Sequence, residues 1–228
     1  MRPLRTIGAI GDIHAEERSL AAALEHLARE GVDAVLAVGD IVDGQGSVVD
    51  CCRLLREAGA VVVRGNHERW ILRGEMRSLP YATDAAELGG AALAFLEALP
   101  ATRVLDTVAG RLLLCHGLGE DDMVSVREDD FGYALQSNDP LQRLLHTRDV
   151  AIVVNGHTHA RMVRSFDGLT IVNAGTLCRD HRPCFARLDL AAGAVTFYDL
   201  SPDHRVTGST TVELFRDDAS RPTIPPPP

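Results

Sequence analysis

Apolar residues recur at two different spacings in the first part of the chain. Continuous apolar runs with the length of buried strands occupy residues 6–10, 34–38 and 60–63. Apolar side chains at helical spacing fill residues 17–29 and 48–58. Because parallel strands need a crossover connection, usually a helix, this alternation predicts a parallel sheet with right-handed connections.

Farther along the chain, strand patterns follow one another with fewer helices between them. Helical patterns occupy residues 68–74, 85–99 and 140–146. Strand patterns occupy residues 104–108, 111–115, 150–154, 161–166, 170–172, 184–190 and 195–200. The acidic stretch 119–139 is interpreted as a surface excursion. The combined pattern predicts an α/β fold with two mixed sheets packed face to face and helices outside, a four-layer α-β-β-α sandwich.

Length and composition agree with a globular protein. The chain has 228 residues, of which 46% are hydrophobic and 24% charged. We expect a single domain over residues 1–215, followed by a proline-rich, disordered tail at residues 216–228. No apolar run is long enough to span a bilayer, and the N-terminus lacks the core of a signal peptide, so a cytoplasmic protein without membrane contact is predicted.

The charge balance limits the classes of partner. A net charge of −9 argues against broad nucleic-acid binding, which needs a basic surface. It leaves a small anionic substrate open, because bound cations reverse the local field. Five cysteines without CxxC spacing do not predict a disulfide framework.

Polar side chains follow five of the predicted strands at the point where each strand ends. They are Asp12 and His14, Asp40, Asn66 and His67, His116, and His157 and His159. Singly, such an Asp is usually a helix cap and such a His a structural residue. Jointly, they indicate a metal centre, since imidazole, carboxylate and amide ligands suit Mn²⁺, Fe, Zn²⁺ or Co²⁺ better than Ca²⁺. They exceed the needs of one ion, whereas two ions about 3.5–4 Å apart that share a carboxylate would use them all.

These residues lie in motifs that resemble those of the calcineurin-like metallophosphoesterases. The motifs are GDIH at 11–14, GD at 39–40, GNHE at 65–68, HG at 116–117 and GHTH at 156–159. The small bacterial phosphodiesterase (YfcE-like) branch is the most similar, because its Asn-Pro-Gly-Ser signature resembles the Asn-Ala-Gly-Thr sequence at 173–176.

The resemblance implies two divalent metal ions per chain, with Mn²⁺ favoured and Fe, Zn²⁺, Co²⁺ or Ni²⁺ as alternatives. It assigns Asp12, His14 and His159 to the first ion, Asn66, His116 and His157 to the second, and Asp40 to both. It also implies that His67 is not a ligand but an acid near the leaving group, and that Asp43 orients it.

The implied reaction is hydrolysis of a small phosphodiester, with nucleotide-derived compounds among the candidates, by in-line attack of a metal-bridging hydroxide. Related protein phosphatases place an arginine clamp where this chain has Gly44, which disfavours monoesters. Asn66 and Arg179 are the candidate substrate-binding residues. The alternatives are a phosphomonoesterase, such as a protein phosphatase or a dinucleoside polyphosphate hydrolase, and a non-enzymatic metal-loaded scaffold. A homo-oligomer is left open.

Overall fold

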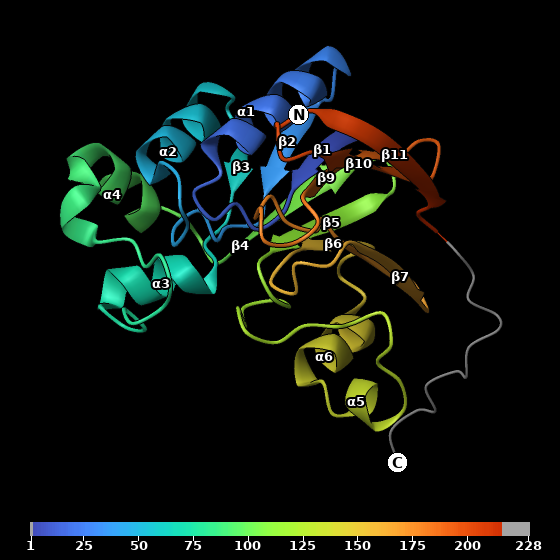
Figure 1. Cartoon of the computed structure of the whole chain (residues 1–228). Coiled ribbons are helices and arrows are strands. Elements are labelled where there is room, and N and C mark those ends of the chain that lie inside the picture. Colours follow the sequence, from blue (N-terminus) through green and yellow to red (C-terminus); the bar gives the residue numbers. More distant parts are fainter. Residues whose placement is uncertain (1, 216–228) are drawn as a thin grey trace.

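The computed structural model describes residues 2–215, and two β-sheets form its centre (Figure 1). The larger sheet has the strand order β11-β10-β9-β1-β2-β3. Its bounds in that order are Val206–Glu213, Ala194–Leu200, Cys184–Asp189, Thr6–Ile10, Ala34–Ala37 and Val61–Val62. The smaller sheet has the order β4-β5-β6-β8-β7. Its bounds are Thr102–Thr107, Gly110–Cys115, Ile152–Asn155, Leu169–Asn173 and Met162–Phe166.

Both sheets are mixed, as predicted. In the larger sheet β1, β2 and β3 are parallel, whereas β9 pairs antiparallel to β1 and continues into a meander with β10 and β11. In the smaller sheet β5, β6 and β8 are parallel, and the edge strands β4 and β7 are antiparallel. The carboxyl ends of the parallel strands are where open α/β sheets place their sites.

The central strands read as continuous apolar runs because both of their faces are buried. Ile7 and Leu36 of the larger sheet share one cluster with Leu114 and Val154 of the smaller sheet. Ile10 faces the other way, into a cluster beneath helices. The two sheets therefore pack face to face, and each has a second apolar side to cover.

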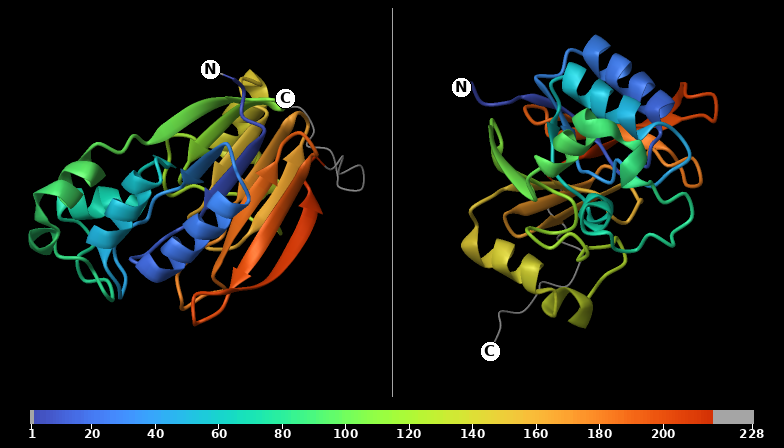
Figure 2. Two further views of the ribbon diagram at one scale, coloured as in Figure 1. Left: turned by 90° about the horizontal axis from the view of Figure 1, so that it is seen from above. Right: turned by 90° about the vertical axis from the view of Figure 1, so that its left-hand side faces the viewer.

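Helices cover these outer sides and complete the four layers, which confirms the predicted fold class. The helices over the larger sheet are α1 (Glu17–Arg29), α2 (Val48–Glu57) and α4 (Gly89–Glu97). The helices over the smaller sheet are α5 (Tyr133–Gln136) and α6 (Asp139–Thr147). The right-hand view of Figure 2 shows α1 and α2 above the sheets, and α5 and α6 below them.

Several elements differ from the prediction. Helix α3 (Asn66–Arg73) begins inside the central motif, with Gly65 as its N-cap. The helix predicted over residues 85–99 is broken into the 3₁₀ turn η1 (Ala85–Glu87) and α4, because Gly89 adopts a left-handed φ of 68°. The acidic stretch contains α5, and β11 was not predicted.

The structure bears only in part on the predictions of membrane contact and domain organisation. None of the helices within residues 2–215 is long and apolar enough to cross a membrane. The tail at 216–228 lies outside the described residues, and the division into one domain over residues 1–215 stays a prediction.

Candidate metal centre

All seven predicted ligands and His67 come together at the carboxyl ends of five strands. The loops after β1, β2 and β3 from the larger sheet meet those after β5 and β6 from the smaller sheet near the middle of the view (Figure 1). The contributing residues are Asp12 and His14 after β1, Asp40 after β2, Asn66 and His67 at the start of α3, His116 after β5, and His157 and His159 after β6.

The backbone at this edge is strained. The φ angles of His14, Asp40, Asp43, His157 and His159 are 46°, 49°, 61°, 68° and 58°. Residues other than glycine rarely adopt this left-handed region, at a cost of about 1–3 kcal/mol each. Strain on so many neighbouring polar residues indicates that the fold maintains their side-chain positions for a function.

The first group of ligands is built around two imidazoles. The Nδ1 atom of His14 donates to the Asp43 carbonyl oxygen at 3.0 Å, which leaves its Nε2 lone pair facing Nε2 of His159, also at 3.0 Å. Two nitrogen ligands that each lie about 2.1 Å from one ion, with an angle of about 90° between the two bonds, are about 3 Å apart. Burial, His14 and His181 lower the pKa of His159 to about 3, so its ring stays neutral. Both rings are therefore suited to share a cation.

The second group pairs His116 with an amide oxygen. Nδ1 of His116 donates to the Val38 carbonyl oxygen at 2.8 Å, so its Nε2 atom is aimed at Asn66 Oδ1, 2.8 Å away. Nδ1 of His157 lies 3.1 Å from the same oxygen. An Nε2 lone pair and an oxygen acceptor at this distance need a cation or a proton between them. Burial opposes the proton, but Asp40 and Asp12 raise the pKa of His116 to about 10, so a metal would displace this proton.

Asp40 lies between the two groups. Its Oδ2 atom is 3.3 Å from Nε2 of His116 and 3.9 Å from Nε2 of both His14 and His67. Asp40 belongs to both clusters of close ligand atoms, one with His14 and His67 and one with Asp12 and His116. Burial would raise the pKa of Asp40, but the imidazoles hold it well below its usual range, so the carboxylate stays charged.

Asp12 has one oxygen without a partner. Its Oδ1 atom accepts the backbone N–H of His157 at 2.9 Å. Its Oδ2 atom is buried and meets no hydrogen-bond donor among residues 2–215. Burial raises the pKa of this carboxyl group. An unsatisfied buried carboxylate oxygen is costly, and a cation would satisfy it, so the donor set fits a divalent metal.

Glu68 closes the GNHE motif, but its role in this centre was not predicted from the sequence. Its buried carboxylate accepts the N–H groups of Gly65 and Asp40 through Oε2, both at 2.8 Å. Its Oε1 atom accepts those of Ile41 at 2.6 Å and Val42 at 3.2 Å. Glu68 thereby holds the strained Asp40 backbone. The sequence carries one signal for it, the glutamate three residues after an N-cap, which is half of a capping box.

His67 and Asp43 form a hydrogen-bonded pair, as the resemblance implies. Nδ1 of His67 lies 2.7 Å from Oδ2 of Asp43, and the Trp70 ring lies against the imidazole with centroids 4.7 Å apart. Burial favours the neutral ring, but the bond to Asp43 outweighs it and raises the pKa of His67. Asp43 in turn is held to a pKa of about 2, because His67 and Arg77 outweigh the effect of its burial. The acid role of His67 stays a prediction, since His67 also lies within one ligand cluster.

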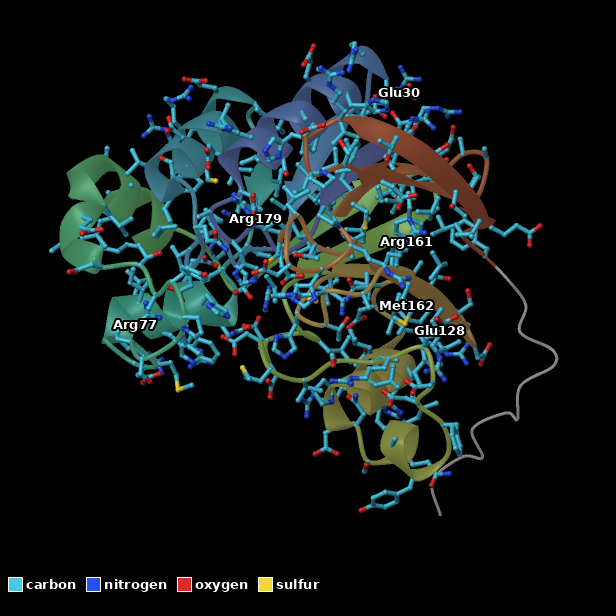
Figure 3. The ribbon with its side chains drawn as sticks, in the orientation of Figure 1. Glu30, Arg77, Glu128, Arg161, Met162 and Arg179 are labelled. Atoms are coloured by element: carbon cyan, nitrogen blue, oxygen red, sulfur yellow. The ribbon has the colours of Figure 1, made fainter. Side chains whose placement is uncertain are left out.

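Three arginines near the centre are paired with carboxylates. Arg179 Nε and Nη2 donate to Glu16 at 2.6 and 2.9 Å, and Arg69 makes a similar double contact with Asp122. Arg77, a second residue that the sequence did not reveal, donates to Asp43. Figure 3 shows Arg77 beside α3 and Arg179 near the middle of the view. The predicted substrate contact of Arg179 stays a prediction, made by a guanidinium that Glu16 holds in place.

Comparisons with known proteins bear on the motifs and the fold. The family model described as the calcineurin-like phosphoesterase superfamily domain matches residues 6–193, which confirms the resemblance seen in the motifs. A segment of 75 residues, 33% of this chain, is 33% identical to the uncharacterized protein MJ0912 of Methanocaldococcus jannaschii and covers 30% of that protein. The chain therefore spans less than a third of that relative in the match.

Solved structures share the fold. A metallophosphoesterase from Sphaerobacter thermophilus is 24% identical, with a TM-score of 0.66 over 88% of this chain and 89% of that one. An archaeal phosphodiesterase is 17% identical, with a TM-score of 0.57 over 86% of this chain and 99% of that one. At these identities the similarity establishes the architecture alone.

Proposed function

This chain belongs to the calcineurin-like phosphoesterase superfamily, and on that premise we propose that it is a metal-dependent hydrolase of a small phosphodiester. The observation that carries the proposal is the position of Asp40 between two groups of candidate ligands, beside an oxygen of Asp12 that has no hydrogen-bond partner within residues 2–215. The phosphodiesterase activity named for the archaeal protein of the same fold supports the substrate class.

Two divalent ions would be held by residues of this chain. Asp12, His14, His159 and Asp40 would hold the first, and Asn66, His116, His157 and Asp40 the second. When bound, the ions would supply an activated water for in-line attack and neutralise charge on the phosphoryl oxygens. Mn²⁺ is the preferred candidate from the mixed nitrogen and oxygen ligands, with Fe, Zn²⁺, Co²⁺ and Ni²⁺ as alternatives.

His67 would carry the proton that the leaving alcohol requires. Its Nδ1 atom is engaged by Asp43, and its Nε2 atom lies 3.9 Å from Asp40, so the second nitrogen faces the centre. A carboxylate behind the ring favours the charged imidazole and fixes its orientation. Trp70 covers part of the ring and limits its contact with water. Asn66 and Arg179 would contact the substrate.

The surroundings favour diesters over monoesters. A Cβ atom at Gly44 would collide with the His14 carbonyl oxygen, so no side chain fits where related phosphatases have an arginine. Arg69, Arg77 and Arg179 each already face a carboxylate. A monoester carries nearly one more negative charge than a diester at neutral pH, and its second charge would lack a dedicated clamp.

The test uses purified protein reconstituted with Mn²⁺. We expect a higher kcat/KM for bis-nitrophenyl phosphate than for nitrophenyl phosphate, after correction for the intrinsic reactivity of each ester. A preference for the monoester would favour the phosphomonoesterase alternative. Bound metal without turnover of either ester would favour the scaffold alternative. Elemental analysis of the same preparation tests the stoichiometry, and a value that never exceeds one ion per chain would contradict the two-metal site.

A further inference from the structure

Arg77 makes four hydrogen bonds beside the candidate acid. It lies between α3 and η1, in a segment without a repeating apolar pattern. Nη1 and Nη2 donate to Oδ1 and Oδ2 of Asp43 at 2.9 and 3.0 Å, the parallel double contact that a guanidinium makes with a carboxylate. Nε donates to the Glu75 carbonyl oxygen at 2.6 Å, and Nη1 also reaches that of Thr83 at 3.2 Å. The guanidinium is thus fixed in place before any substrate binds.

Asp43 depends on this segment for its orientation. Its carboxylate has four partners: Nδ1 of His67, the two nitrogens of Arg77, and the backbone N–H of Thr83 at 2.8 Å. The backbone N–H of Asp43 donates back to the Thr83 hydroxyl at 2.8 Å. Apart from His67, every hydrogen-bond donor to this carboxylate among residues 2–215 therefore comes from one short segment, 34 to 40 residues farther along the chain.

We propose that Arg77 is a positioning residue, which acts through Asp43 to hold His67 in the orientation for donating a proton to the leaving group. This inference rests on the proposed hydrolysis. The bidentate contact fixes the plane of the carboxylate, so that Oδ2 faces Nδ1 of His67 at 2.7 Å. Without Arg77, Asp43 loses two of its four partners, and only the Thr83 N–H and His67 itself then oppose rotation of the carboxylate about χ2. The imidazole then loses its fixed orientation, although every metal ligand remains.

The geometry assigns Arg77 this role rather than that of a phosphate clamp. Its five N–H groups already make four hydrogen bonds within the protein. A clamp needs a bidentate pair of donors free for phosphate, and the pair on Arg77 is occupied by Asp43.

The test compares two leaving groups. In Arg77→Ala we expect kcat to fall about 10–100-fold for a phosphodiester that releases an alcohol, less than the roughly 10²–10⁴-fold of a complete general-acid effect, because His67 itself remains. For bis-nitrophenyl phosphate, whose nitrophenolate needs no proton, we expect a loss below about 3-fold. Metal content and KM should stay unchanged. Arg77→Lys should recover part of the rate, because lysine restores the positive charge but cannot make the bidentate contact of a guanidinium.

Arg53→Ala is the matched control, since Arg53 also pairs with carboxylates, those of Asp50 and Glu57, but lies on the exposed face of α2. It should leave both rates unchanged. Equal losses for the two leaving groups in Arg77→Ala, or a raised KM with an unchanged kcat, would overturn the inference, the latter in favour of a clamp. If the wild-type protein turned over neither diester, the proposed function would fail instead.

A second measurement does not require activity. The Nδ1–H proton of His67, hydrogen-bonded to Asp43, should give a downfield proton NMR signal that is absent from His67→Gln. We expect this signal in the wild type and Arg53→Ala, and its loss or broadening in Arg77→Ala and, more weakly, in Arg77→Lys. An unchanged signal in folded Arg77→Ala would show that Asp43 orients His67 without Arg77.

Discussion

Two loops that carry predicted ligands are held in place by different means. The Asp40 loop (residues 39–44) is tied by Glu68, which is not a predicted ligand and whose carboxylate accepts four backbone N–H groups around Asp40. All of these contacts are made by the protein itself. The loop therefore holds its strained conformation through bonds that need no metal.

The histidine loop (residues 156–159) is tied by a residue that is itself a predicted ligand. Oδ1 of Asp12 accepts the N–H of His157, and the Asn173 amide group donates to the Gly156 carbonyl oxygen at 2.6 Å. The other oxygen of Asp12 has no partner within residues 2–215. This loop therefore depends in part on a carboxylate with one oxygen that a bound cation would satisfy.

The difference shows that the two sides of the site depend on the metal to different extents. One side, with the carboxylate shared by both ligand groups, is preorganised by buried hydrogen bonds. On the other side, one oxygen of Asp12 lacks a partner within residues 2–215 and would be stabilised only when a metal ion binds. Metal binding and local folding are therefore coupled there. The following predictions test this division, from the largest expected effect to the smallest.

Asp40→Asn should have the largest effect on activity. The amide keeps an oxygen for the His67 N–H bond, so the loop conformation survives, but the charge that faces both ligand groups is lost. We expect kcat/KM to fall about 10³-fold or more and the number of bound ions to drop. Asp50→Asn, on the exposed side of α2, is the control and should change neither. Near-native activity and metal content in Asp40→Asn would remove Asp40 as the shared ligand.

The residues of this site could be predicted from the sequence only in part. Apolar runs ending in Asp, Asn or His predicted which side chains meet, because parallel strands deliver their carboxyl ends to one edge. The role of Glu68 was missed because three of its four bonds reach backbone groups 26 to 28 residues away, and only the bond to Gly65 leaves a signal in the sequence. Arg77 was missed because its segment has no periodicity, and its partner is fixed only by the tertiary fold.

The fold shows the same limit. Continuous apolar runs indicate buried strands, and the two mixed sheets were predicted from these runs. β11 (Val206–Glu213) was missed because it is an edge strand with most of its side chains exposed, and the five residues between Val206 and Val212 are Thr, Gly and Ser, which form no apolar run. Its pairing with β10 comes from backbone hydrogen bonds, which composition does not reveal.

Glu68→Gln should affect the protein even without metal. The amide has one acceptor oxygen, and its NH₂ group would face backbone N–H donors, so at least two buried N–H groups lose their partner. We expect the metal-free protein to lose about 1–3 kcal/mol in free energy of unfolding, and metal affinity to fall about 10–100-fold.

Glu57→Gln is the matched control, because Glu57 pairs with Arg53 on the exposed face of α2. It should stay within about 0.5 kcal/mol of the wild type in urea unfolding. If Glu68→Gln unfolded like the control in the metal-free state, the Asp40 loop would not be preorganised by Glu68.

Metal removal should separate the two loops. After chelation, we expect hydrogen exchange at the His157 amide, which is bonded to Asp12, to accelerate about 10-fold or more. The amides of Ile41 and Val42, bonded to Glu68, should accelerate less. Exchange measured by NMR on metal-loaded and chelated protein checks this, and equal acceleration at both loops would contradict the division.

The smallest effect concerns the acid stability of the metal-free protein, where a carboxylate of the Asp40 loop and the carboxylate that anchors the histidine loop act with opposite sign. His67 and Arg77 outweigh burial and lower the pKa of Asp43, in the Asp40 loop, to about 2. A carboxyl group ordinarily titrates near 4, so Asp43 stabilises the fold above that pH, and this contribution is lost between about pH 4 and 2. Burial raises the pKa of Asp12, which anchors the histidine loop, so its protonation stabilises the fold as pH falls through that raised value.

Urea unfolding of chelated protein from pH 6 downward measures both contributions to stability. Asp43→Asn should lose less stability than the wild type below about pH 4, and Asp12→Asn should lack the gain above it. Parallel curves for the wild type and both variants would mean that neither carboxylate titrates differently in the folded and unfolded chains.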